Sequence, residues 1–279
     1  MSGMELSELT DTESDLKTMF NGCGKLCLIK TPKHLEKKIA LPNSKLGWYR
    51  DDSYTKLTYL PQKMNKSYPV HKQEDKNKFV DVRTDTWQYE YVNEAYKAKL
   101  MNGKDTTRDS NKLIIFDVDT NLTRAEFIQT LYNYEAKPDV KYMNVFKDVP
   151  KGKWYTNAVI WAYKHKLVSG IGDKKFGVDQ KITRQDMITI LYKYAKNCNE
   201  KYVSNASKYK LVGYIDAGSV SEYAKIPMTW ANGNQIISGK LISTDKDNIK
   251  YKLAPKDTAT RGECAAILTK YMKYINNFK

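Results

Sequence analysis

The chain has 279 residues, of which 47 are Lys or Arg and 32 are Asp or Glu, so its formal net charge is +15. This excess favours anionic partners, namely nucleic acid, acidic lipid or an acidic polysaccharide, without choosing among them. With 41% hydrophobic and 12% aromatic residues, the composition favours a folded protein over a disordered one. No stretch approaches the ~18–20 consecutive apolar residues that a membrane-spanning helix needs.

Residues 1–77 differ in kind from the rest of the chain. Their start is acidic and lacks the basic and apolar regions of a secretory signal peptide, so none is predicted. The basic, polar stretch that follows is interrupted by three prolines, and only residues 56–60 alternate weakly, as a strand would. We interpret residues 1–77 as an irregular basic region without an independent core and as a candidate docking arm for a protein partner.

Residues 78–279 contain three similar repeats, at about 78–137, 144–198 and 212–275. In each, an Asp precedes an aromatic residue, a helical apolar pattern and then a Gly. The first and second repeats are related by a constant offset of 67 residues, which indicates internal duplication. The Asp, aromatic and Gly positions are, in order, Asp81, Trp87 and Gly103; Asp148, Trp154 and Gly170; and Asp216, Tyr223 and Gly239.

A second signature follows the Gly of each repeat. It reads Thr-Arg-x-Glu or Thr-Arg-x-Asp and stands directly before a second helical apolar pattern, so each repeat is predicted to be helix–loop–helix. A Thr with an acid three residues later predicts a capping box at the helix start. The Arg is left unexplained, because a cation in the first turn opposes the helix dipole. We therefore expect Arg124, Arg184 and Arg261 to face an anionic ligand.

The loops between the paired helices differ. The loop between Gly170 and Arg184 keeps the sequence Gly-Asp-Lys-Lys-Phe. The corresponding loops of the first and third repeats have lost it and are about eight residues longer, an insertion that costs little stability in a surface loop. Ligand binding is accordingly predicted most strongly for the second repeat.

The order Phe-x-Asp-Val, Trp, an Ala-bearing helix, Leu-Val-x-Gly and Ile-Thr-Arg resembles the S-layer homology domain, and residues 78–279 resemble three such domains in tandem. The resemblance implies a mainly α fold in which three helix–loop–helix repeats form a pseudo-threefold bundle. It also implies ligand grooves between neighbouring repeats. The implied ligand is an anionic secondary cell-wall polysaccharide of a Gram-positive-type envelope, often capped by a pyruvate ketal.

The resemblance also implies roles for the repeated residues. The three Arg would offer a planar, forked cation to a carboxylate of the polymer. The three Asp would accept sugar hydroxyls, Trp87 and Trp154 would lie against sugar faces, and the three Gly would permit close backbone approach. Each role has a structural alternative: the Asp as helix caps, the Trp as mostly core residues with one edge exposed, and the Gly as helix C-caps. Tyr223, in place of Trp, weakens the third groove.

No arrangement of His, Cys, Ser and carboxylates predicts catalysis, and no cofactor or metal site is expected. The four cysteines lack zinc-ligand spacing, and Cys264 falls on a predicted core position. Nucleic-acid binding has the charge but no recognisable motif. We therefore predict a non-enzymatic module at the cell surface or wall. Without a signal peptide, a phage virion or host-attachment protein that docks through residues 1–77 is the alternative.

Overall fold

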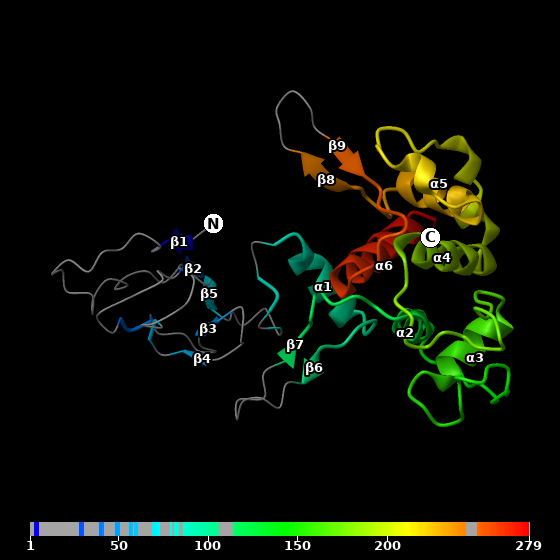
Figure 1. The fold of residues 1–279 in the computed structure, drawn as a ribbon, viewed down its shortest axis with the longest axis horizontal. Coiled ribbons are helices and arrows are strands. Elements are labelled where there is room, and N and C mark those ends of the chain that lie inside the picture. Colours follow the sequence, from blue (N-terminus) through cyan, green and yellow to red (C-terminus); the bar gives the residue numbers. More distant parts are fainter. Residues whose placement is uncertain are drawn as a thin grey trace. The chain divides into compact units, whose positions relative to one another are not determined.

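The computed structural model describes residues 79, 81–83, 86–105, 114–243 and 250–278, together with short stretches at 3–5, 28–30, 39–41, 48–50, 56–57, 59–60 and 69–72. The described part of the chain is mostly helical (Figure 1). It divides into two compact units. The N-terminal unit comprises Met1–Glu90 with Gly103–Asp117, and the C-terminal unit comprises Tyr91–Asn102 with Val118–Lys279.

The N-terminal unit contains a five-stranded sheet with the strand order β1-β2-β5-β3-β4. Strands β1 and β2 are parallel, and the other neighbours are antiparallel. Ile29 in β2 and Trp48 in β3 are buried. The strands are β1 (Gly3–Glu5), β2 (Leu28–Lys30), β3 (Trp48–Arg50), β4 (Lys56–Leu57) and β5 (Pro69–Lys72).

This sheet corrects the prediction of an irregular N-terminal region. Only β4 falls where the weak alternation predicts a strand. The others were missed because they are only three or four residues long, and β1 and β2 also pair with partners far away in sequence, so no local pattern marks them. The absence of an independent core in residues 1–77 and their docking role stay predictions. Cys23 and Cys27 lie outside the described residues.

The same unit holds the loop of the first repeat. Its long insertion forms two paired strands, β6 (Lys104–Asp105) and β7 (Ile114–Ile115). Phe79 and Phe116 pack edge to face beside them, with ring centroids 5.2 Å apart. Helix α1 (Gln88–Lys97) follows Trp87 and crosses the division between the two units.

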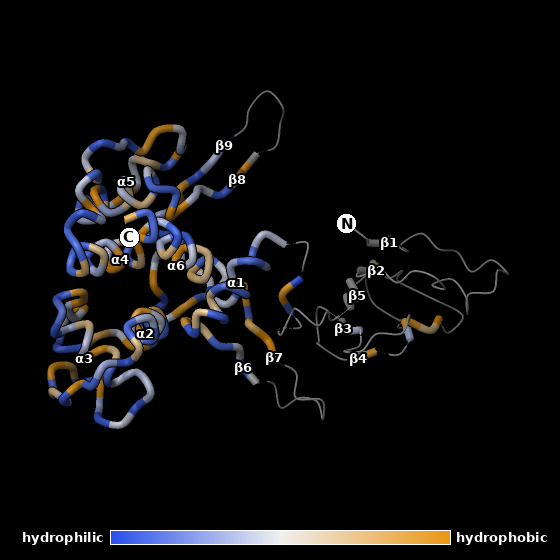
Figure 2. The backbone as a smooth tube through the Cα atoms, turned by 180° about the vertical axis from the view of Figure 1, so that it is seen from behind, coloured by the Kyte–Doolittle hydropathy of each residue, from blue (hydrophilic) through white to orange (hydrophobic). Residues whose placement is uncertain are grey.

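The helices of the C-terminal unit bury the apolar stripes that the sequence predicts. Phe127 and Leu131 in α2, Met187 and Leu191 in α4, and Cys264 in α6 are fully buried. Figure 2 shows hydrophobic and hydrophilic residues mixed along each helix, as half-buried helices require. The helices are α2 (Arg124–Tyr134), α3 (Thr156–Lys164), α4 (Arg184–Cys198), α5 (Lys225–Gly233) and α6 (Arg261–Asn276).

Smaller elements complete the unit. The long loop of the third repeat forms a bulged hairpin that projects from the helices (Figure 1), with strands β8 (Lys240–Ser243) and β9 (Lys250–Lys252). The second repeat has only a tight turn, in which the Lys175 amide donates to the Gly172 carbonyl at 2.8 Å. Short 3-10 helices span η1 (Glu200–Val203), η2 (Ala206–Lys208), η3 (Ala217–Ser219) and η4 (Glu222–Ala224).

The segments that precede α2, α4 and α6 meet in a closed ring of backbone hydrogen bonds. Leu122 N donates to Ala259 O at 2.9 Å, Ala259 N donates to Ile182 O at 2.9 Å, and Ile182 N donates to Leu122 O at 3.0 Å. Each of these residues stands immediately before the Thr of the Thr-Arg signature. The ring therefore brings the starts of the three helices together, although they lie far apart in sequence.

The second helix of each repeat packs against a first helix of another repeat. Helix α2 packs on α3, and α4 packs on α5. Helix α6 reaches back to α1, where Thr269 Oγ1 donates to the Tyr91 carbonyl at 3.4 Å and Lys273 pairs with Glu94 at 3.1 Å. Burial of each second helix thus depends on a different repeat from its own.

Candidate functional site

The Thr of each Thr-Arg signature caps its helix, as predicted. The third amide of α2 donates to Thr123 Oγ1 at 3.1 Å, and that of α6 donates to Thr260 Oγ1 at 3.2 Å. In both helices the Glu reaches back to the Thr amide, at 2.7 Å for Glu126 and 3.1 Å for Glu263. Two complete capping boxes are therefore confirmed.

The first two backbone amides of α2, α4 and α6 also have hydrogen-bond acceptors. Arg124 N donates to Gln180 O at 2.8 Å, Arg184 N to Asp257 O at 2.9 Å, and Arg261 N to Thr120 O at 2.9 Å. The amide after each Arg likewise donates to a loop carbonyl of another repeat. Helix starts normally leave such amides open to an anion. Here the neighbouring loops satisfy them, so the helix starts themselves offer no anion site.

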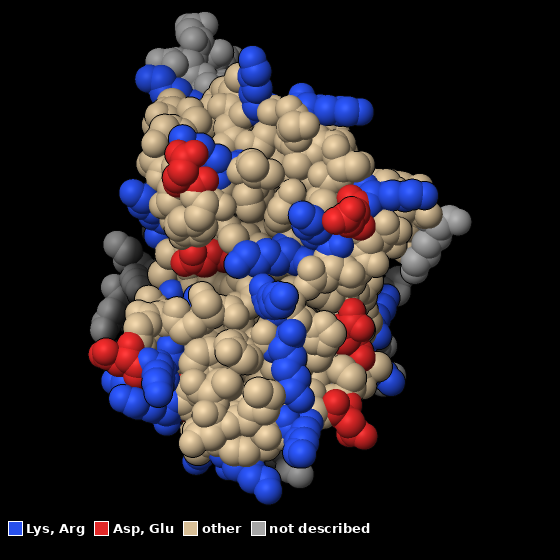
Figure 3. All heavy atoms as spheres, turned by 90° about the vertical axis from the view of Figure 1, so that its right-hand side faces the viewer, with Lys and Arg blue, Asp and Glu red and all other residues tan. Residues whose placement is uncertain are grey.

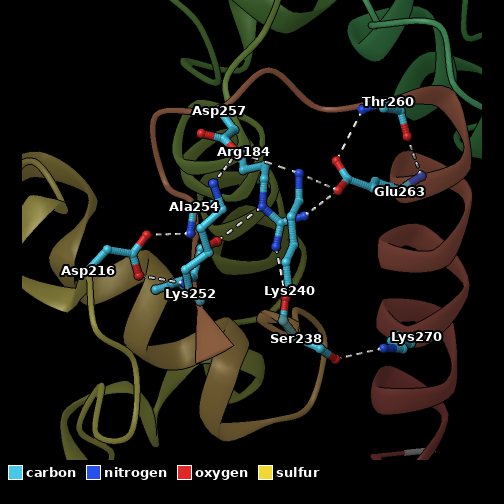
Figure 4. Close-up of polar contacts among 11 residues, drawn as sticks. Arg184, Asp216, Ser238, Lys240, Lys252, Ala254, Asp257, Thr260, Glu263 and Lys270 are labelled. Carbon is cyan, nitrogen blue, oxygen red and sulfur yellow. Dashed lines mark hydrogen bonds and ion pairs between the residues drawn. The ribbon is translucent and has the colours of Figure 1, made fainter. Parts of the chain in front are cut away.

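The arginines extend this inter-repeat contact, most completely at Arg184 (Figure 4). Arg184 is only 3% exposed. Nε donates to Leu253 O at 3.2 Å and NH2 to Ser238 O at 2.8 Å, while NH1 pairs with Glu263 at 3.0 Å. The guanidinium therefore ties the second repeat to the loop of the third and to the capping acid of α6.

The other two arginines make equivalent bonds. Arg124 donates from Nε to Phe176 O at 3.2 Å and from NH2 to Ser169 O at 3.4 Å, and it lies over the Phe176 ring. Arg261 is 7% exposed and donates from NH2 to Asn102 O at 2.8 Å. Ser169, Ser238 and Asn102 each stand just before the repeated Gly.

These contacts supply the reason for the arginines that the sequence did not reveal. Each guanidinium donates to at least one carbonyl oxygen of another repeat. Arg124 is the least buried of the three, and burial lowers its pKa despite the charges of Asp186 and Asp148. The ligand role of the arginines stays a prediction, and it is strongest for Arg124.

The three Asp close the loops of their own repeats. Asp148 accepts from the amides of Phe176 and Gly177, both at 2.7 Å. Asp81 does the same with residues 116 and 117, and Asp216 with residues 253 and 254. Burial raises the pKa of Asp148, but the amide hydrogen bonds outweigh it, so the pKa lies below its usual value.

The alternative of the Asp as helix caps is wrong. Helix α3 begins after Tyr155 and α5 after Ala224, and neither cap residue uses its side chain. Asp148 instead fixes the loop that receives Arg124, because the Phe176 carbonyl that accepts from Arg124 belongs to a residue whose amide Asp148 holds. The sugar-binding role of the three Asp stays a prediction.

The three Gly allow close packing inside the fold. A Cβ on Gly103 would lie 2.5 Å from the Phe79 ring, one on Gly170 would lie 2.7 Å from Lys175 O, and one on Gly239 would lie 2.3 Å from the Tyr214 ring. The alternative of Gly as left-handed helix C-caps is wrong, because Lys99, Lys166 and Gln235 occupy those positions with φ of 57–59°. Backbone approach to a sugar stays a prediction.

We expect Gly170→Ala to destabilise the chain by ~1–3 kcal/mol, because the new methyl group would overlap the Lys175 carbonyl in a packed interior. Chemical denaturation followed by circular dichroism measures this. Gly218→Ala is the matched control, since nothing lies near its Cβ position. Equal stability of the two variants would contradict the packing role.

The aromatic residues at the start of each first helix are the most exposed members of the repeated set. Trp87 is 56% exposed, Trp154 is 60% exposed and Tyr223 is 56% exposed. The alternative of Trp residues that are mostly core with one edge exposed is therefore wrong, because more than half of Trp87 and of Trp154 is exposed. Exposing a large indole at equivalent positions gives up burial that would stabilise the fold. The role of these rings in lying against sugar faces stays a prediction.

Tyr223 differs from the two Trp in a way that the sequence analysis missed. Its hydroxyl donates to Asp186 Oδ1 at 2.6 Å and accepts from Gln185 Nε2 at 3.0 Å. Asp186, one methylene shorter than Glu, accepts from Thr183 Oγ1 instead of the Thr183 amide, so the predicted third capping box is incomplete. Burial and the Asp186 carboxylate raise the pKa of Tyr223 to about 12.

We expect Tyr223→Phe to lower the free energy of unfolding by ~0.5–1.5 kcal/mol, the net worth of a hydrogen bond. The exposed ring would remain, but it would no longer be held by α4. Thermal unfolding measures the first effect. Tyr251→Phe is the control, because it removes the hydroxyl of another exposed Tyr in the third repeat. Equal shifts in melting temperature for the two variants would argue against a specific stabilising role of the Tyr223 hydroxyl.

Within the described residues, no group of three or more His, Cys, Asp and Glu side chains lies close enough to hold a metal ion. Cys198 and Cys264 are both free, and burial raises the pKa of the Cys264 thiol to about 12, consistent with the predicted core role. No helix in the described ranges has the length and apolar character needed to cross a membrane.

The helix pairs, their Thr caps and the exposed aromatic ring near the start of each first helix recur along the chain, so they define a helical repeat module. Residues 78–128 and 145–188 match the family model of the S-layer homology domain. The chain therefore carries S-layer homology domains at these two segments.

The chain is also similar to larger proteins. It is 28% identical to exoglucanase XynX of Acetivibrio thermocellus over 71% of this chain and 16% of that protein. It is 28% identical to an amylopullulanase of Thermoanaerobacterium thermosulfurigenes over 68% of this chain and 9% of that protein. It is 22% identical to a cell surface protein of Thermoanaerobacter kivui over 66% of this chain and 26% of that protein. The chain thus spans about a quarter or less of each of these relatives.

Proposed function

We propose that this chain is a binding module that attaches to an anionic secondary polysaccharide of a Gram-positive-type cell wall and so resides at the cell surface. The observation that carries the proposal is the exposure of Trp87, Trp154 and Tyr223 at equivalent positions of the three repeats. The S-layer homology match and the similarity to a cell surface protein support it.

We propose further that residues 212–275 form a third S-layer homology repeat and that the three repeats make a pseudo-threefold bundle. The cyclic hydrogen bonds among Leu122, Ile182 and Ala259 support this arrangement. So does Asp216, which holds two loop amides in the same manner as Asp148.

In this proposal the exposed rings lie against sugar faces, while the arginines fix neighbouring repeats and supply positive potential beneath the polymer. The face seen in Figure 3 carries more Lys and Arg than Asp and Glu, which suits a polyanion. Arg124, with the least buried guanidinium, is proposed to reach a carboxylate of the polymer. The chain itself is proposed to be non-catalytic, with residues 1–77 as a docking arm.

Cosedimentation with purified wall sacculi tests the proposal. Sacculi that retain their secondary polysaccharide should capture the chain, and sacculi stripped of it should not. Selective removal of the polymer's acidic groups should weaken capture strongly, because an anionic ligand is the basis of the proposal. Equal capture by intact and stripped sacculi would refute it.

A further inference from the structure

The hairpin of the third repeat carries exposed apolar residues that the roles derived above do not use. Leu241 on β8 and Tyr251 on β9 are cross-strand neighbours, so their side chains lie on the same face of the hairpin. Both are exposed, and so is Ile242, which stands at the shift in register between the two strands. Apolar side chains left in water on a projecting element mark a surface that a partner covers.

One edge of this hairpin is open for pairing with a further strand. On the far side of β9, the Ile215 amide donates to the Tyr251 carbonyl at 3.1 Å, and Tyr214 pairs with Tyr251 in parallel. Within the described part of the chain, β8 pairs with β9 and with no other strand. The outward amides and carbonyls of β8 therefore form an edge that another strand can join.

The lysine of β8 does not defend this edge. Proteins commonly place a lysine on an exposed edge strand, because its charge opposes pairing with another chain. Lys240 holds that position, but its ammonium is bound to Glu263 at 3.0 Å (Figure 4). Asp257 adds a second carboxylate at 3.7 Å. The charge of Lys240 is therefore compensated within its own chain.

The sequence of β8 is complementary to itself. Antiparallel pairing about a twofold axis at Leu241 places the two copies of Leu241 opposite each other and Lys240 opposite Ile242. Like charges do not face one another in this register, and the two leucines form a cross-strand apolar pair. The apolar face then runs from Tyr251 of one copy through both leucines to Tyr251 of the other. A contact that uses the same patch on both subunits closes on a dimer.

The other two repeats do not present such an edge in the described part of the chain. The second repeat has only the tight turn between Gly172 and Lys175 in place of a hairpin. In the first repeat, the strand equivalent to β8 is β6, which consists of Lys104 and Asp105 and has no apolar residue. The third repeat therefore supplies the self-complementary edge.

We propose that β8 pairs with β8 of a second copy of this chain, which gives a dimer joined through a four-stranded sheet with the order β9-β8-β8-β9. Pairing of strands this short buries less than the ~1,600 Å² of a standard interface, so the dimer is expected to form and dissociate with concentration. Chains gathered on a surface meet at high local concentration, and a dimer binds a polymer with raised avidity. The inference goes beyond the proposed function, because this pairing requires no ligand.

Sedimentation velocity of the full chain over a range of concentrations tests the pairing. Wild type should shift from one chain to two as the concentration rises. Leu241→Lys should stay monomeric throughout, because two lysines would then face each other at the twofold axis. Ile226→Lys is the matched control, since Ile226 is also an exposed apolar residue of the third repeat but lies in α5. It should dimerise as wild type does, and circular dichroism verifies the fold of both variants.

Cross-linking locates the contact. Leu241→Cys should give an intermolecular disulfide under mild oxidation in much higher yield than wild type, whose own cysteines set the background. The reason is that residues facing each other across paired strands bring their Cβ atoms within ~4.5–5.5 Å.

Three results would each overturn the pairing: wild type that is monomeric at every concentration, Leu241→Lys that dimerises like wild type, or cross-linking of Leu241→Cys at the background level. Assembly of wild type beyond two chains would overturn the closed, twofold contact. Capture of the chain by wall sacculi is a separate measurement, so failure of the dimer leaves the proposed function standing, and failure of capture leaves the dimer standing.

Discussion

Arg184→Ala is expected to lower the free energy of unfolding by ~3–5 kcal/mol, the usual cost of breaking a buried ion pair from one side. The change would leave Glu263 paired only with Lys240 and would strip two carbonyls, of Leu253 and Ser238, of their donor. Because these partners belong to the third repeat, the loss should loosen the contact between repeats. Urea unfolding followed by circular dichroism measures it.

Arg124→Ala is the control for this effect. Arg124 donates to two carbonyls in the same manner, but it is less buried and its longer NH2 bond measures 3.4 Å. Its loss should cost ~1–2 kcal/mol. If Arg184→Ala were no more destabilising than Arg124→Ala, the stabilising role assigned to the contacts of Arg184 with the third repeat would be wrong.

Trp154→Ala is expected to weaken binding to the wall polysaccharide by roughly tenfold to a hundredfold, as truncation of an aromatic anchor commonly does. The fold should survive, because the indole is 60% exposed and its removal opens no cavity. Titration of the variant with polysaccharide fragments measures the change in affinity. The remaining aromatic sites would retain part of the avidity for the intact polymer.

Met143→Ala serves as its control, since Met143 is also a large exposed apolar residue but lies just before the second repeat and outside the signature. It should leave affinity unchanged. Comparable losses for the two variants would indicate a nonspecific effect of surface hydrophobicity rather than a sugar platform at Trp154.

The helices and their caps could be predicted from the sequence because both depend on near neighbours. Thr123 and Glu126 stand three residues apart, and that spacing alone predicts the bonds they make. The apolar stripe of α4 likewise follows from a helical period. Repetition of the pattern three times extended these local predictions to the order of the elements along the chain.

The roles of the signature residues depend on distant partners and could not be predicted in this way. Arg184 bonds to Leu253, 69 residues away, and Asp148 to Phe176, 28 residues away. Strands β1, β2 and β5 of the N-terminal sheet could not be predicted either, because β2 pairs with β1 and β5, which are distant in sequence. The contact of Tyr223 with Asp186 and Gln185 did leave a signal in the sequence. Tyr223 replaces Trp in the third repeat, and in the second repeat Asp186 replaces Glu and Gln185 replaces a small residue.

The central claim is that the exposed aromatic rings of the repeats hold the wall polymer. The most direct measurement is titration calorimetry of the triple variant Trp87→Ala, Trp154→Ala, Tyr223→Ala with purified anionic secondary polysaccharide, after circular dichroism has verified its helical content. The account predicts that the binding heat of wild type falls to the level of buffer. Wild-type affinity in the folded triple variant would contradict it.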